Sequence, residues 1–196
     1  MTEYHLTTPL NLNDIVELQA GDIVYISGTL YTARDEAHLR ILEWTAESRT
    51  LPFDLEGAAV YHCGPLMKRE SNGWRVVAAG PTTSARMTEM TPGLLDNYNV
   101  RAIIGKGGMK DIAPVLKDRC VYLAYTGGCA ALTVDMIKSV KGVHWPDLGM
   151  PEAVWVLEVE EFGPLIVGVD AKGNDLFAEV MERAGKVFEL STNHDI

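Results

Sequence analysis

The chain has 196 residues, of which 47% are hydrophobic and 22% are charged, and its formal net charge at pH 7 is −10. This composition is typical of a globular protein with a sizeable core. It contains no run of about 20 apolar residues that could cross a membrane. The negative charge argues against a nucleic-acid partner, because phosphate binding requires a basic face.

These properties predict a single domain over residues 1–196, with a core over about residues 10–180 and a tail over 191–196. The first residues show neither the basic nor the apolar region of a secretory signal, so we expect a cytoplasmic protein. Three cysteines, Cys63, Cys120 and Cys129, lie in or beside apolar runs. Their number and spacing fit neither a disulfide framework nor a zinc motif. We therefore expect buried thiols and no iron–sulfur cluster on this chain alone.

The hydrophobic pattern predicts strands and helices that alternate along the chain. The predicted strands cover residues 22–28, 58–63, 74–79, 102–105, 120–125, 153–159 and 165–169. The predicted helices cover about residues 33–47, 109–117, 129–140 and 174–183, and a turn at 162–164 separates the last two strands. This alternation with short connections is typical of an α/β domain. Val- and Ile-rich strands at both ends of the chain indicate an added β layer.

Four of the predicted strand-to-helix junctions share a short turn that is rich in glycine and threonine. Their sequences are GTLYTARD at 28–35, GPTTSAR at 80–86, GKGG at 105–108 and TGGCA at 126–130. In open α/β folds ligands bind beyond the carboxyl ends of the strands, where such turns lie. The free N–H groups of a helix start favour an anion there, and glycine lets the backbone approach a ligand closely.

Three cations occupy these turns. We expect Arg34 in the first turn of a helix that Thr32 caps, and Arg86 in the first turn of a helix that Thr82 or its neighbour caps. Lys106 lies just ahead of another predicted helix. A cation at a helix start opposes the helix dipole. An anionic ligand would explain this placement.

Surface ion pairs are the alternative, in which Arg34 and Arg86 pair with nearby carboxylates such as Asp35 and Glu89. The sequence leaves both interpretations open. A nucleotide is disfavoured as the anion, because Lys106 is not part of a P-loop and no GxGxxG follows a strand. Two arginines that can each bind a carboxylate through two hydrogen bonds suit a small dicarboxylate better.

Together with further motifs, these turns resemble the β subunit, or C-terminal domain, of class I iron–sulfur fumarases and L-tartrate dehydratases. The matching runs, in the family's order, are GTLYTARDEAH at 28–38, GP at 64–65, GPTTSARM at 80–87, GKGGM at 105–109, YTGG at 125–128, DLGMPEA at 147–153 and FGP at 162–164. The resemblance covers about residues 10–180. It implies a swivelling β/β/α domain.

The resemblance also implies a reaction, the reversible hydration of a carbon–carbon double bond, such as fumarate to (S)-malate. A [4Fe-4S] cluster held by a separate α subunit would take part, and a dimer of αβ pairs is expected. By motif, Arg34 and Arg86 would bind substrate carboxylates, Lys106 would lie in the same pocket, and Thr82 would be the base that takes the C3 proton. Because a hydroxyl is a weak base, Thr82 acting only as a helix cap and substrate contact is the alternative.

Two other functions remain open: the β subunit of an L-tartrate or other 2-hydroxydicarboxylate dehydratase, and a non-catalytic dicarboxylate-binding domain. His38 lies four residues after Arg34 and could face the pocket, but we expect a partly exposed helix histidine. His62 and His144 are expected to be structural. Glu152 is interpreted as a strand charge at the surface, without a role.

Overall fold

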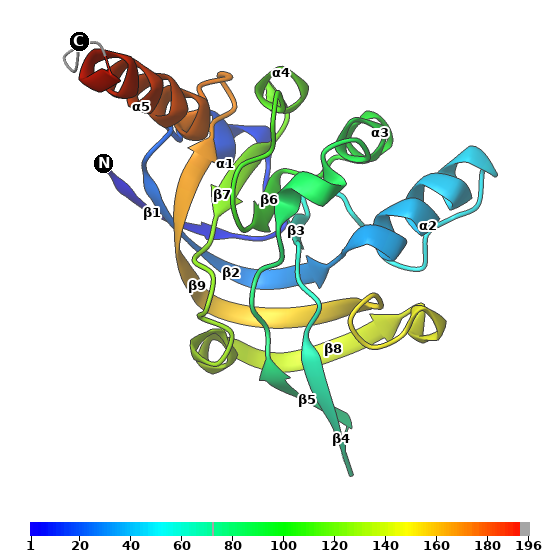
Figure 1. Ribbon diagram of the computed structural model, residues 1–196. Coiled ribbons are helices and arrows are strands. Elements are labelled where there is room, and N and C mark those ends of the chain that lie inside the picture. Colours follow the sequence, from blue (N-terminus) through cyan, green and yellow to red (C-terminus); the bar gives the residue numbers. More distant parts are fainter. Residues whose placement is uncertain (72, 193–196) are drawn as a thin grey trace.

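The computed structural model describes residues 1–71 and 73–192, which fold around a small closed barrel. Four neighbouring strands run parallel: β2 (Ile23–Thr32), β3 (Ala59–Tyr61), β6 (Ala102–Gly105) and β7 (Val121–Ala124). The long strand β9 (Val154–Val169) runs antiparallel to them and pairs with both β7 and β2 (Figure 1). This double pairing closes the barrel and confirms the mixed α/β class.

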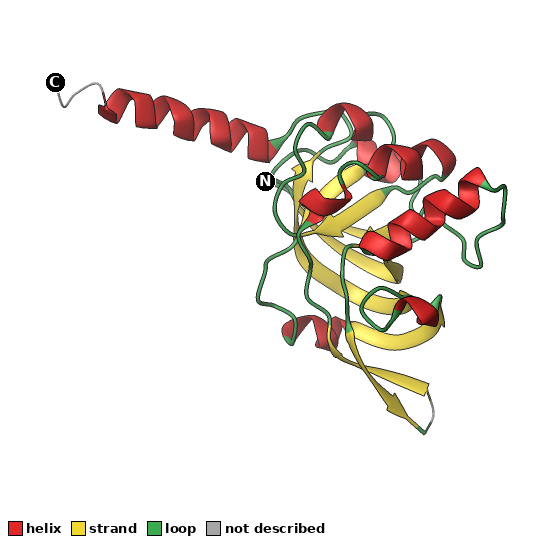
Figure 2. Cartoon of the chain, turned by 45° about the vertical axis from the view of Figure 1, so that its right-hand side comes forward, coloured by secondary structure: helices red, strands yellow, loops and turns green. Residues whose placement is uncertain are grey.

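Four further strands extend this framework. Strand β1 (Glu3–Thr7) runs parallel to the first half of β2, and β8 (Ile137–His144) runs antiparallel to β9. Strands β4 (Leu66–Glu70) and β5 (Gly73–Ala78) form a separate antiparallel hairpin. This hairpin projects from the barrel (Figures 1 and 2).

The helices are mostly short. They are α1 (Leu12–Val16), α2 (Asp35–Ala46), α3 (Thr91–Asn97), α4 (Ala113–Leu116) and α5 (Leu176–Thr192), with 3-10 turns η1 (Ser84–Met87), η2 (Leu132–Met136) and η3 (Pro146–Leu148). Helices α2, α3 and α4 lie on one side of the barrel, and α5 extends away from the body (Figure 2). No helix in the described part of the chain has both the length and the apolar character needed to span a bilayer.

Two cores meet across the parallel strands. Tyr61 and Ile104 point into the barrel, whereas Val60 and Ile103, their neighbours in sequence, belong to a second core shared with α2, α3 and α4. Successive side chains of a strand point to opposite faces. Since both faces are covered, these strands are apolar throughout, which is why they were recognisable as short apolar runs.

The predicted helix over residues 129–140 is wrong. Its first part is the 3-10 turn η2, and its last part opens strand β8. Tertiary pairing accounts for the difference, because β8 lies against β9 and Lys138 and Lys141 make cross-strand ion pairs of 3.0 and 3.7 Å with Glu160 and Glu158.

Several other boundaries differ from the expectation. The strand predicted over 22–28 continues to Thr32, and the helix predicted over 109–117 is reduced to α4. The predicted turn at 162–164 lies inside the continuous strand β9, because Phe162 is buried in the barrel opposite Ile26 of β2. The last helix does not stop near residue 183 but continues to Thr192. The expected tail over 191–196 therefore begins as helix, and its residues 193–196 lie outside the described part.

Phe162→Ala should lower the free energy of unfolding by about 3–5 kcal/mol, because it empties the centre of the barrel. The Phe162 ring is fully buried and contacts Tyr61 and Tyr125 at centroid distances of 5.2 and 5.3 Å. Denaturant unfolding monitored by circular dichroism would measure the loss. Leu39→Ala, at a side chain that is 52% exposed on α2, is the control and should change stability little. A loss below about 1 kcal/mol in Phe162→Ala would contradict a tightly packed barrel centre.

Candidate functional site

The residues that follow the parallel strands gather at one edge of the barrel. Arg34 follows β2, Gly64 follows β3, Lys106 follows β6 and Gly127 follows β7. Because these strands run in the same direction, their carboxyl ends share that edge. The sequence-predicted turns at 105–108 and 126–130 therefore lie near one another and near Arg34. The turn predicted over 28–35 is wrong for residues 28–32, which continue strand β2.

Thr82 lies at the same edge, between the segments that follow strands β3 and β6. Its N–H donates to the His62 carbonyl at 2.7 Å, and its carbonyl accepts from the Lys106 N–H at 3.1 Å. Isolated bridges join the flanking residues to Cys63 and Lys106. Thr82 does not cap a helix, because the residue before η1 is Thr83, which makes no side-chain capping bond either. The cap interpretation of Thr82 is wrong.

The side chain of Thr82 instead contacts Arg86, which the sequence predicts to bind a substrate carboxylate. Arg86 Nη2 donates to Thr82 Oγ1 at 2.9 Å. The same nitrogen lies 3.0 Å from Asp35 Oδ2, and Arg34 Nη2 lies 3.7 Å from that oxygen. A continuous chain of contacts thus runs from Arg34 through Asp35 and Arg86 to Thr82. Both guanidinium groups contact the carboxylate of Asp35, so the two arginines are close enough together to bind a carboxylate of a ligand as well.

Surface ion pairing with Asp35 and Glu89 was the alternative for these arginines, and the pairing with Asp35 is confirmed. Both arginines contact Asp35, and the side chains of Arg34 and Arg86 are 22% and 45% exposed. No ion pair joins Arg86 to Glu89 among the described residues. Arg34 makes a second contact, at 3.2 Å, with Glu152 Oε1. The pairing with Asp35 leaves the arginines side by side and accessible.

Arg34 is the residue before helix α2 and not part of its first turn. The expected cap, Thr32, is the last residue of β2, and its hydroxyl donates to the Ala153 carbonyl at 3.3 Å and accepts from the Trp155 N–H at 3.0 Å. These bonds tie the end of β2 to the start of β9. The capping prediction for Thr32 is therefore wrong, because a partner distant in sequence takes its hydroxyl.

Glu152 has a defined place, contrary to the expectation of a surface charge without a role. One carboxylate oxygen pairs with Arg34, and the other accepts the Glu36 N–H at 3.1 Å. Its side chain is only 16% exposed. Glu152 therefore holds the Arg34 side chain and the first turn of α2 together.

Gly64 gives Arg34 its space. A Cβ at this position would collide with Arg34 Nη1 and would lie 2.8 Å from the Pro151 carbonyl oxygen. Arg34 Nε is buried and has no hydrogen-bond partner in the described part of the chain. Close packing of the arginine, rather than backbone contact with a ligand, explains the glycine at position 64.

Lys106 joins the site through its backbone. Its N–H and C=O bond to Thr82 and Ser84, while its exposed side chain packs over Gly127, where a Cβ would lie 2.9 Å from Lys106 Cδ. No ion pair involves Lys106 among the described residues.

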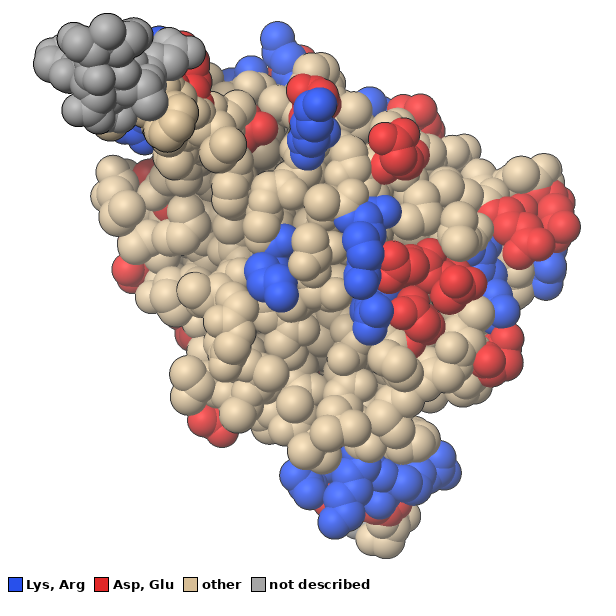
Figure 3. Space-filling view, in the orientation of Figure 1, with Lys and Arg blue, Asp and Glu red and all other residues tan. Residues whose placement is uncertain are grey.

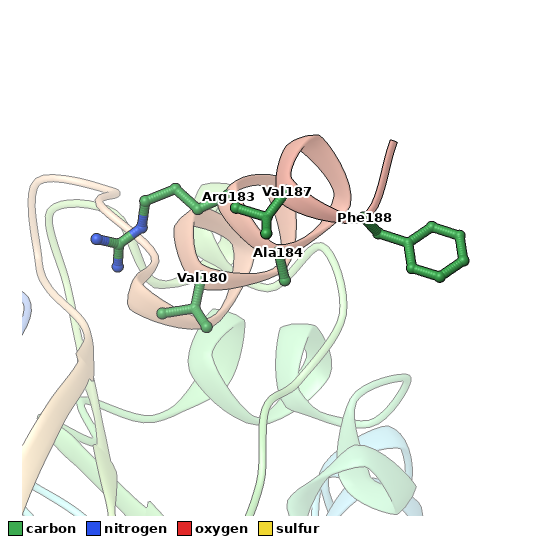
Figure 4. A pocket seen from close by; sticks show the side chains of 5 residues that line it. All are labelled: Val180, Arg183, Ala184, Val187 and Phe188. Atoms are coloured by element: carbon green, nitrogen blue, oxygen red, sulfur yellow. The ribbon is translucent and has the colours of Figure 1, made fainter. Parts of the chain in front are cut away.

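The surface seen in the orientation of Figure 1 carries lysine or arginine side chains near its centre, and one of these basic groups borders an acidic group (Figure 3). A separate groove on α5, lined by Val180, Arg183, Ala184, Val187 and Phe188, contains none of the predicted site residues (Figure 4).

Buried histidines lie behind this edge. His38 is 1% exposed, so the expectation of a partly exposed histidine is wrong. The sequence carried a signal for its burial, because His38 lies beside Ala37 and three residues before Ile41, both on the buried face of α2. His62, expected to be structural, is fully buried and its Nδ1 lies 2.9 Å from Ser84 Oγ. Sequence reasoning did not identify Ser84.

Two of the cysteines border the candidate site: Cys63 bridges to Pro81, the residue before Thr82, and Cys129 lies in the turn at 126–130. Cys63 and Cys120 are buried, as expected, and burial raises the pKa of each thiol to about 12. Cys129 is only half-buried, so the expectation of a buried thiol is wrong there, and its thiol donates to the Thr126 carbonyl at 2.8 Å. Within the described residues no group of three or more His, Cys, Asp or Glu side chains could hold a metal ion.

Comparison with known proteins places this chain among named relatives. The family model described as "Fumarase C-terminus" matches residues 1–180. A Methanocaldococcus jannaschii protein provisionally named L(+)-tartrate dehydratase subunit beta is 49% identical over 183 residues, which cover 92% of each chain. The L(+)-tartrate dehydratase subunit beta of Escherichia coli K12 is 40% identical over 179 residues, covering 89% of this chain and 86% of the relative.

A Geobacillus stearothermophilus protein provisionally named class I fumarate hydratase is 39% identical over 178 residues, covering 89% of this chain and 34% of that longer protein. The match thus includes both separate β subunits and one part of a longer chain. The edge that carries Arg34, Thr82, Arg86 and Lys106 lies within the region that the family model matches. This chain belongs to the Fumarase C-terminus family, together with the β subunits of L(+)-tartrate dehydratase.

Proposed function

We propose that this chain is the β subunit of a class I fumarate hydratase, which interconverts fumarate and (S)-malate together with a separate α subunit. The observation that carries the proposal is the chain of contacts from Arg34 through Asp35 and Arg86 to Thr82. Two planar guanidinium groups can each grip a carboxylate through paired hydrogen bonds. In the complex, Arg34 and Arg86 bind the substrate carboxylates, and Lys106 adds positive charge at the same barrel edge.

Thr82 is the proposed base for the C3 proton. A hydroxyl becomes a useful base only where neighbouring positive charge stabilises its deprotonated form. Arg86 supplies such a charge directly, because its Nη2 donates to Thr82 Oγ1. Backbone bonds on both sides of Thr82 fix where its hydroxyl lies. The proton for the departing hydroxyl would come from the α subunit.

The [4Fe-4S] cluster of the proposed enzyme would belong to the α subunit, because the cysteines here do not fit it. A cluster needs thiolates. Cys63 and Cys120 are buried with pKa values raised to about 12, so they stay protonated at neutral pH. When bound to its own subunit, the cluster supplies a Lewis acid for the substrate hydroxyl. We further propose a dimer of αβ pairs in the cytoplasm, and a swivelling β/β/α identity for the barrel with its outer helices.

A second candidate is the dehydration of L-tartrate, which the names of the M. jannaschii and E. coli relatives favour. Both reactions use the same two arginines. Coexpression with the α subunit, followed by assays with fumarate, (S)-malate and L-tartrate, would separate them. Turnover of tartrate but not fumarate would replace the first proposal. Binding of dicarboxylates without turnover of any would indicate a non-catalytic binding domain.

Arg86→Lys should lower kcat/KM of the αβ complex by about 100-fold, because an ammonium cannot reproduce a planar two-point grip and no longer supports Thr82 in the same way. Steady-state kinetics with fumarate would measure the loss. Arg75→Lys, at an exposed arginine that pairs with Glu70 on the β4–β5 hairpin, is the matched control and should leave kinetics unchanged. Kinetics near wild type in Arg86→Lys would remove Arg86 from the substrate site.

Glu152→Gln should raise KM about 10-fold, because the amide keeps an acceptor for the Glu36 N–H but loses the charge that holds Arg34. The effect on kcat should be smaller, since the Thr82–Arg86 contact is not touched. Glu160→Gln, at an exposed carboxylate paired with Lys138, serves as the control. An unchanged KM in Glu152→Gln would show that Arg34 does not depend on Glu152 for its orientation.

The purified β chain should remain colourless after anaerobic treatment with iron and sulfide. Its cysteines are not grouped, and two of them are held as thiols by burial. Iron analysis and electron paramagnetic resonance after reduction would test this, with the αβ complex as the positive control. A stoichiometric cluster on the β chain alone would overturn the proposed division of labour.

A further inference from the structure

Two buried histidines lie directly behind the arginines and have no role in the reaction proposed above. His38 and His62 are 1% and 0% exposed. Their rings meet edge to face, with centroids 5.2 Å apart and planes at 69°. Each ring has one nitrogen, Nε2, that is buried without a hydrogen-bond partner in the described part of the chain. Each also has one nitrogen that contacts a segment of the candidate site.

His38 holds the backbone of Arg34. Its Nδ1 lies 2.8 Å from the Arg34 carbonyl oxygen. Because a carbonyl can only accept, Nδ1 carries the hydrogen and Nε2 carries the lone pair in the neutral ring. The same carbonyl also accepts the His38 backbone N–H at 2.9 Å. Arg34 has no side-chain cap of its own at the start of α2, so the His38 ring adds a second restraint on this residue.

His62 holds the Thr82 segment through Ser84. Its Nδ1 lies 2.9 Å from Ser84 Oγ, which is also 3.0 Å from the Tyr122 hydroxyl. Tyr122 lies 2.6 Å from the Gly107 carbonyl, which must receive the tyrosine hydrogen. The Ser84 hydroxyl can then donate to the Tyr122 oxygen and accept the hydrogen of His62 Nδ1, so both contacts of Ser84 Oγ are satisfied. In that arrangement Nε2 of His62, like Nε2 of His38, carries the lone pair of a neutral ring.

The space for this contact is built into strand β6. A Cβ at Gly105 would collide with Ser84 Oγ and would lie 3.2 Å from His62 Nδ1. Ser84 is further held by its N–H, which donates to the Lys106 carbonyl at 3.0 Å. Because Ser84 is two residues after Thr82, its position restricts where the Thr82 hydroxyl can lie.

The histidine pair adds no charge to the site at neutral pH. Burial lowers the pKa of His38, against the opposing effects of its bond to the Arg34 carbonyl and of Asp35. Burial, His38 and Arg86 together lower the pKa of His62 further. A charged imidazolium beneath two guanidinium groups would be unfavourable. Both rings are therefore uncharged and act on the site through their hydrogen bonds.

We propose that His38 and His62 are positioning residues for the dicarboxylate site, His38 through the Arg34 carbonyl and His62 through Ser84 and the Thr82 segment. Neither reaches the surface, so neither contacts substrate. Each sets the place of a group that does. This inference rests on the proposed function, because it assigns supports to the residues that would bind and deprotonate the substrate.

Paired variants of the αβ complex test the proposal, because asparagine retains a hydrogen-bonding group near the place of Nδ1 whereas leucine does not. His38→Leu should raise KM for the dicarboxylate about 10-fold and lower kcat less than threefold, while His38→Asn should restore most of the loss. His62→Leu and Ser84→Ala should lower kcat about 10-fold, since they release the Thr82 segment. His62→Asn should retain part of the kcat that His62→Leu loses. His144→Leu, outside the site, is the control.

The pattern of kinetics separates positioning from general structure. If the leucine and asparagine variants lose active protein equally, and the protein that remains active keeps the wild-type KM and kcat, the histidines are only structural and the proposal is overturned. Where His62→Leu does not fold, Ser84→Ala decides for that half, because it removes a single hydroxyl. Wild-type kinetics in Ser84→Ala would refute the His62 half.

A readout without turnover distinguishes failure of this inference from failure of the proposed function. The Arg34 Nε–H is buried and unpartnered in the described structure, so it should give a slowly exchanging NMR signal in the 15N-labelled full chain. That signal should survive in His38→Asn and shift or vanish in His38→Leu. If the wild-type complex hydrates no dicarboxylate, the proposed function fails and this signal still decides: an unchanged signal in His38→Leu overturns the positioning role.

Discussion

Closure of the barrel by strand β9 is the constraint on which the rest of the structure depends. Strand β9 is antiparallel to both β7 and β2 and so joins the two ends of the parallel set. Once closed, the four parallel strands deliver their carboxyl ends to one edge. Phe162, at the middle of β9, fills the interior and packs on Tyr61 and Tyr125. The site is thus held by a rigid framework, although its residues lie in loops.

Electrostatic balance at that edge follows from the same framework. Two arginines placed close together repel one another unless carboxylates lie between or beside them. Asp35 lies between Arg34 and Arg86, and Glu152 lies beside Arg34, brought there from the segment that leads into β9. These carboxylates keep the arginines in place in the free chain. A dicarboxylate that enters the site meets guanidinium groups that are already oriented, which reduces the entropy lost on binding.

Hydrogen bonding beneath the arginines completes the arrangement. Buried polar groups need hydrogen-bond partners. His38 has its partner in the Arg34 carbonyl, and His62 has its partner in Ser84, two residues after the proposed base Thr82. The glycines at positions 64 and 105 belong to this packing, because a Cβ there would collide with Arg34 or with Ser84. Gly105 was interpreted from the sequence as a place for the backbone to approach a ligand, whereas Gly64 was recognised only as part of a family motif. The structure assigns them instead to the close packing of the side chains that form the site.

The sequence by itself determined the α/β class, the positions of the main barrel strands and the family, because short apolar runs and ordered motifs are local properties of the chain. It also singled out Arg34, Thr82, Arg86 and Lys106, since they lie in those motifs. Only the tertiary structure decided that residues 137–144 form a strand, that Thr32 bonds across to β9, and that Asp35 and Glu152 hold the arginines. The partners in each of these contacts include residues distant in sequence, whose meeting depends on barrel closure and on no local pattern.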